Sequence, residues 1–182
     1  VQFLKPPSLD EVIAKRKADL TDYQNAAYAT RYAHFVQLVR QAEAQACPGK
    51  TSLTDAVARN LYKLMAYKDE YEVARLHTDP AFLQSVRAQF DGDVALHYHL
   101  APPLLAKTNA KGELVKQPFG PWVRHAFGAL KHLRFVRGTA LDVFGYTEER
   151  RTERALIGEY QRAIERALSS LNADTYAQAV EL

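Results

Sequence analysis

Apolar residues recur at helical spacing along most of this chain, and this periodicity constrains its fold more than any other sequence feature. The clearest stripe lies before a Pro48-Gly49 stop and comprises Tyr28, Tyr32, Phe35, Val39 and Ala42. Similar stripes follow in residues 57–65 and 157–171. Because amphipathic helices bury their apolar faces against one another, the pattern predicts a mainly α, bundle-like fold.

Capping residues predict where these helices begin. Ser8 followed by Glu11 has the spacing of a capping box, in which each side chain bonds the other residue's backbone N–H. Thr21 is expected to begin the next, longer helix, and either Ser52 or Thr54 the one after it.

The middle of the chain has a different composition. Six of the eight glycines lie between Gly92 and Gly145, which indicates turns and irregular backbone there. Val94, Leu96, Tyr98 and Leu100 alternate with other residues as in a strand. We therefore predict a small β-hairpin near residues 93–117 within one helical domain that spans residues 1–182.

Positive charge gathers in residues 101–137, which hold seven Lys or Arg and one acid, Glu113. The candidate interaction surface comprises Lys107, Lys116, Trp122, Arg124, Lys131, Arg134 and Arg137. Such a surface suits an anionic partner, namely an acidic protein, the phosphates of CoA or RNA. The alternative is a solvated helix face followed by a loop. The net charge of the whole chain is only +3, which disfavours nucleic acid.

Several polar groups are candidates for catalytic or metal sites. His97 and His99 would share one strand face and supply two ligands, but no third ligand is near in the sequence. Residues 90–93 resemble part of a magnesium loop and fit a turn better, because Gly92 tolerates positive φ. Cys47 at a helix end is typical of a structural residue. We assign no catalytic, cofactor-binding or metal-binding residue to this chain.

Residues 67–71, Tyr-Lys-Asp-Glu-Tyr, would make either an acid–base site or a helix-junction network, and the junction is favoured because Asp69 and Glu70 point in different directions on a helix. The lone cysteine cannot form an internal disulfide, so a reducing, cytoplasmic setting is expected. No apolar run approaches the length of about 18 residues that a membrane span needs.

Five stretches, in order, resemble the C-terminal region of the long, fused bacterial indolepyruvate ferredoxin oxidoreductases. They are LTDYQNAAYATRY (20–32), ARNLYKLMAYKDEYEVARLHTDPAF (58–82), HLAPPLLAK (99–107), FGPW (119–122) and LRFVRGTALDVFGYTEERRTERALI (133–157). Their length and order carry the resemblance, because none is a chemical motif.

The resemblance implies a longer, homo-oligomeric parent enzyme that oxidatively decarboxylates arylpyruvates to acyl-CoA and passes electrons to ferredoxin. It further implies that thiamine diphosphate, Mg²⁺ and iron–sulfur clusters are held outside these residues. This chain would then be a non-catalytic accessory domain that contacts other domains of the same polypeptide. The alternatives are a docking surface for ferredoxin or CoA in residues 101–137, and an independent nucleic-acid-binding helical module.

Overall fold

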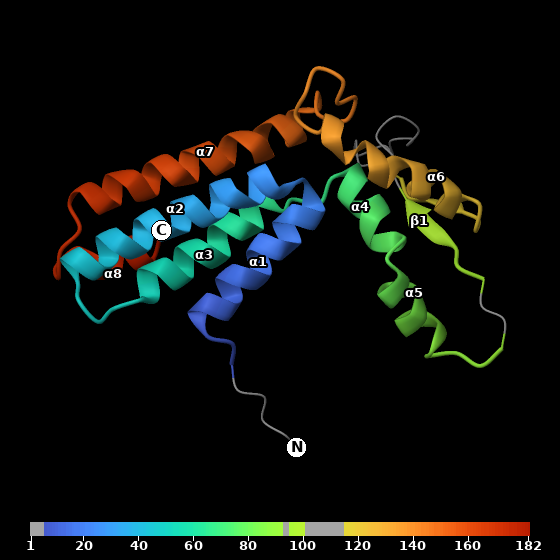
Figure 1. Cartoon of the computed structure of the whole chain (residues 1–182). Coiled ribbons are helices and arrows are strands. Elements are labelled where there is room, and N and C mark those ends of the chain that lie inside the picture. Colours follow the sequence, from blue (N-terminus) through green and yellow to red (C-terminus); the bar gives the residue numbers. More distant parts are fainter. Residues whose placement is uncertain (1–5, 93–94, 101–114) are drawn as a thin grey trace. The chain divides into compact units, whose positions relative to one another are not determined.

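A computed structural model describes residues 6–92, 95–100 and 115–182. In these ranges it has eight α-helices and one two-stranded antiparallel sheet, which confirms the mainly α fold with a small hairpin. The chain divides into two compact units (Figure 1). Unit 1 comprises Val1–Tyr67 and Glu148–Leu182, and unit 2 comprises Lys68–Thr147. The expectation of a single domain over residues 1–182 stays a prediction.

Unit 1 is a bundle of five helices. They are α1 (Leu9–Tyr23), α2 (Ala26–Ala46), α3 (Ser52–Met65), α7 (Glu148–Ser169) and α8 (Tyr176–Val180). In Figure 1, α2 and α3 run beside each other, and each also contacts α7. The apolar stripe predicted for α2 faces this core, where Tyr32 and Val39 are fully buried. The two segments of unit 1 are distant in sequence and share one core.

The helix starts in unit 1 agree only partly with the predictions. The capping box is present, since Ser8 Oγ accepts from Glu11 N at 3.3 Å and Glu11 Oε2 accepts from Ser8 N at 2.7 Å. Thr21, however, lies inside α1 and donates to the Lys17 carbonyl at 3.0 Å. Asn25 is the N-cap of α2 instead, because its side chain accepts from Tyr28 N at 2.9 Å.

The capping box makes a first testable prediction. Replacing Ser8 with Ala removes an acceptor for an N–H group in the first turn, so the free energy of unfolding should fall by about 1 kcal/mol. Urea unfolding followed by circular dichroism measures this change. Lys17→Ala, at an exposed position of the same helix, is the matched control and should change stability by less than about 0.5 kcal/mol.

Unit 2 combines short helices with the hairpin. Its elements are α4 (Glu70–His77), α5 (Pro80–Arg87), β1 (Tyr98–Leu100), β2 (Gln117–Phe119), α6 (Val123–Leu130) and the 3-10 helix η1 (Lys131–Val136). The buried apolar core of its described residues is small, and it consists of Ala74, Tyr98, Val123 and Phe127. Of the six buried polar or charged residues in the described ranges, four lie in unit 2, namely Asp69, Glu72, Arg137 and Asp142.

The hairpin lies close to its predicted place. Tyr98 pairs with Phe119, and Leu100 pairs with Gln117. The second strand begins at Gln117, the last residue of the range predicted for the hairpin, and runs to Phe119. Residues 101–114, between the strands, and residues 93–94 lie outside the described residues.

Candidate functional site

The residues of the predicted basic surface differ in exposure. Lys116, Trp122 and Arg124 are exposed, and Trp122 keeps 62% of its surface. Lys131 and Arg134 are half-buried in η1, and Lys107 lies outside the described residues. Phe119 contacts the Trp122 ring edge-on, with ring centroids 6.1 Å apart. Of the predicted set, Lys116, Trp122 and Arg124 are the most exposed, while Lys131 and Arg134 keep part of their surface in contact with solvent.

Arg137 does not belong to that surface, because the fold buries it. Its guanidinium forms a two-pronged ion pair with Asp69, in which Nη2 donates to Oδ1 at 2.8 Å and Nε donates to Oδ2. Both side chains are about 95% buried, with exposures of 5% and 4%. Asp69 also caps α4 by accepting from Glu72 N at 2.9 Å. The charge of Arg137 is therefore paired inside unit 2 and does not face solvent. Its partner Asp69 belongs to the junction network that the sequence favours for residues 67–71.

Asp142 organises the loop that follows. Its carboxylate accepts from Gly138 N at 2.8 Å, from Gly145 N at 3.1 Å and from the Tyr71 hydroxyl at 3.1 Å. Burial, with this carboxylate beside it, raises the pKa of Tyr71, so the phenol stays a donor. Gly138 has φ +75°, a conformation that glycine adopts without strain. Asp142 thus ties both ends of the 137–147 loop to α4.

Exposed apolar side chains concentrate in unit 2. Among the described residues thirteen large apolar side chains are exposed, and ten of them lie in unit 2. These ten are Leu76, Phe82, Phe90, Val115, Trp122, Leu133, Phe135, Leu141, Val143 and Tyr146. Soluble surfaces usually carry such residues singly, so this density distinguishes unit 2 from unit 1.

Glu43 forms a second buried polar site, in unit 1. Only 1% of this residue is exposed, and it accepts from Leu53 N and Thr54 N, each at 2.9 Å. It also accepts from Thr54 Oγ1 and from the Tyr176 hydroxyl at 2.6 Å. Burial by itself raises the pKa of Glu43, but these hydrogen bonds outweigh it and hold the pKa below its usual range. Glu43 therefore caps α3, a role that the sequence had assigned to Ser52 or Thr54.

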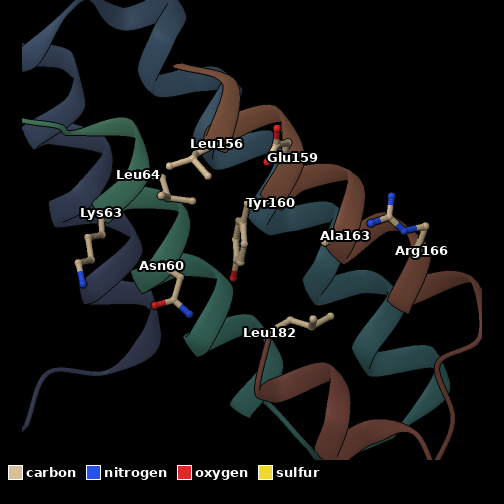
Figure 2. Close-up of a pocket in the computed structure, with 9 residues that line it drawn as sticks. All are labelled: Asn60, Lys63, Leu64, Leu156, Glu159, Tyr160, Ala163, Arg166 and Leu182. Atoms are coloured by element: carbon tan, nitrogen blue, oxygen red, sulfur yellow. The ribbon is translucent and has the colours of Figure 1, made fainter. Parts of the chain in front are cut away.

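An open pocket of about 640 Å³ lies in unit 1 between α3 and α7. Figure 2 shows the Tyr160 ring in this pocket, with its hydroxyl at the end nearer Asn60 and Leu182. Leu64, Leu156 and Ala163 form apolar walls, and Lys63, Glu159 and Arg166 complete the lining. Burial raises the pKa of Tyr160, and the Asn60 amide opposes that shift. Apolar walls, one phenol, one amide and three charged side chains therefore line this pocket.

The remaining sequence candidates do not assemble. His97 and His99 are both exposed on one side of the hairpin, with buried Tyr98 between them. Within the described ranges no three His, Cys, Asp or Glu residues come together in a way that could hold a metal ion. Cys47 is a buried free cysteine. Among those same residues, no helix has both the length and the apolar character to cross a membrane.

Fold and surface together define a mainly helical protein whose second unit displays apolar side chains and whose buried charges hold the fold. Comparison with known families places the chain in one of them. It belongs to the family of unknown function DUF6537, whose model matches residues 9–182. No curated protein and no solved structure matches the chain.

Proposed function

We propose that this chain is a non-catalytic accessory and interaction domain of a cytoplasmic indolepyruvate ferredoxin oxidoreductase. The observation that carries the interaction role is the concentration of exposed apolar side chains in unit 2. The ordered resemblance over residues 20–157 supports the choice of parent enzyme. The buried charged groups Glu43, Asp69, Arg137 and Asp142 support a structural use of polarity, because their contacts cap helices and fix loops.

The chemistry of such a parent would come from polypeptide outside these residues. One iron–sulfur cluster needs about four thiolate ligands, and this chain has one cysteine. Thiamine diphosphate with Mg²⁺ would supply the decarboxylation step in the parent.

Two assays test this proposal together. The full-length gene product, supplied with CoA, thiamine diphosphate and an oxidised ferredoxin, should oxidise indolepyruvate. Residues 1–182 expressed alone should give a helical circular dichroism spectrum and no turnover above the blank. Turnover by the isolated chain would contradict the non-catalytic role, and a cofactor-loaded full-length product without 2-oxoacid oxidation would contradict the choice of parent.

A second candidate function is the docking of ferredoxin or CoA by the basic segment 101–137. Lys116 and Arg124 flank Trp122 in the sequence, and all three are exposed. Asp142, the sole acid within the described residues 115–147, is buried. Both ligands are anionic, so ion-pair steering would attract them to this surface.

Charge reversal tests this docking. The double variant Lys116→Glu/Arg124→Glu in the full-length enzyme should raise the apparent KM for ferredoxin or for CoA by about threefold or more at low salt, because two attractive charges become repulsive. The difference from wild type should shrink at high salt. Arg87→Glu, an exposed cation on α5, is the control. Unchanged constants for both ligands would exclude this surface.

A further inference from the structure

The 137–147 loop reverses the usual distribution of polar and apolar side chains. Its charged residues Arg137 and Asp142 are 8% and 3% exposed, whereas Leu141, Val143 and Tyr146 are 74%, 59% and 57% exposed. Water-facing loops ordinarily place their charges outward, because desolvating a charge is costly. In this loop the charges hold the backbone and the apolar groups face out.

Hydrogen bonds fix this outward display. Besides the three bonds to Asp142, the Tyr146 hydroxyl donates to the Ala140 carbonyl at 2.7 Å across the loop. Thr139 Oγ1 donates to the Val136 carbonyl at 2.7 Å and accepts from Leu141 N at 3.2 Å. Phe144 packs edge-on against Tyr71, with ring centroids 5.4 Å apart. A loop closed in this way loses little conformational entropy when a partner binds it.

The charges near the loop indicate the character of that partner. Lys131 and Arg134 precede the loop in η1 and are partly exposed, whereas Asp142, the one acid within the described residues 115–147, is buried. After the loop, Glu148 and Glu149 are followed by a pair of arginines, so the start of α7 adds no net charge. The complementary surface is therefore apolar at its centre and acidic at its margin.

We propose that the 137–147 loop is a preformed docking element for a folded protein surface that offers an apolar hollow bordered by carboxylates. This inference rests on the proposed interaction role of the chain. Other occupants fit less well. A second copy bound across a two-fold axis would bring Lys131 and Arg134 near their own equivalents. Nucleic acid gains no stacking from Leu141 or Val143, the aliphatic side chains that the loop exposes most.

Photo-crosslinking in the full-length protein tests the proposal. In the organism that makes the protein, the codon for Val143 is changed so that p-benzoylphenylalanine is incorporated at this position (Val143→p-benzoylphenylalanine). The cells are irradiated, and the crosslinked peptide is identified by mass spectrometry. We expect most of the product to converge on one protein peptide that contains apolar residues together with Asp or Glu. Adding Leu141→Asp to the same molecule should reduce that product at least fivefold, because it places a carboxylate against the acidic margin.

The matched control carries the same probe in place of Phe82 on α5, which is 42% exposed in the same unit. It should not give the converging peptide. Products spread over unrelated peptides, linked to nucleic acid or lipid, or joined to the same loop of a second copy would overturn the proposal, as would the lack of any product. Crosslinking reports a contact and not an activity. The docking proposal can therefore fail while the full-length protein still oxidises indolepyruvate, and the crosslink can form in a protein that does not oxidise it.

Discussion

Replacing Glu43 with Ala should lower the free energy of unfolding by more than about 3 kcal/mol, since hydrogen bonds to a charged group contribute about 1.5–3 kcal/mol each. The substitution removes the buried carboxylate that accepts from Leu53 N, Thr54 N and the Tyr176 hydroxyl in unit 1. Urea unfolding followed by circular dichroism gives the difference. Hydrogen exchange of the Leu53 and Thr54 amides should quicken in the same variant.

Two further variants calibrate this effect. Glu43→Gln keeps one acceptor oxygen and removes the charge, so its loss should lie between those of wild type and Glu43→Ala. Glu165→Ala removes an exposed carboxylate from α7 and should change stability by less than about 0.5 kcal/mol. If Glu43→Ala lost no more stability than Glu165→Ala, the capping role of Glu43 would be wrong.

The same carboxylate predicts a pH dependence. Its pKa is lower in the folded chain than the ordinary value of 4.5. Its stabilising contribution is therefore complete above pH 4.5 and is lost as the pH falls through the folded pKa. Wild type should lose more stability than Glu43→Gln in that interval, because other carboxylates titrate equally in both proteins. Parallel curves below pH 4.5 would contradict the assignment.

Arg137→Ala should destabilise unit 2 by about 3–5 kcal/mol, because it leaves the Asp69 carboxylate buried without its counter-charge. Asp69 joins the start of α4 to Arg137, the first residue of the 137–147 loop, so both regions should loosen together. Hydrogen exchange of α4 amides, measured beside urea unfolding, reports this loss. The apolar display of the loop should be disturbed in the same variant.

The double variant Asp69→Asn/Arg137→Met separates charge from shape. Asn keeps the cap on α4, and Met fills much of the space of Arg, so the pair should recover about half of the lost stability or more. Arg59→Ala breaks an exposed ion pair with Asp55 and should cost at most about 1 kcal/mol. A loss for Arg137→Ala as small as that control would show that the buried pair contributes little.

Local rules predicted much of the fold. The apolar stripe of α2 and the Ser8–Glu11 box depend on residues close in sequence, and both are present. Thr21 was a wrong helix start because Asn25, four residues on, offers the cap that the structure uses. The cap on α3 comes from Glu43 in the preceding helix, a contact that no short-range rule predicts. The signal was a charged residue four positions after Val39 on the buried face of α2.

The candidate interaction surface was harder to predict. Charge counting selected Arg137 with the other cations, but the fold buries it against Asp69, 68 residues away in sequence. Leu141, Val143 and Tyr146 read as ordinary apolar residues of an irregular segment, because sequence does not tell which side of a loop faces water. Asp142 lies between Leu141 and Val143 in the sequence, and its burial leaves these two apolar neighbours facing solvent.

Thiol labelling measures most directly whether the loop is covered by a partner. Leu141→Cys and Leu38→Cys are introduced separately into the full-length protein, and each variant is isolated with its partners at low salt. The native Cys47 is only 5% exposed, so it should react slowly. Within this chain Leu141 is 74% exposed and Leu38 41%, so an uncovered loop would react faster with maleimide at position 141. We expect the reverse, with the thiol at 141 modified at least tenfold more slowly than the thiol at 38. Equal or faster modification at 141 would contradict the interaction role of this loop.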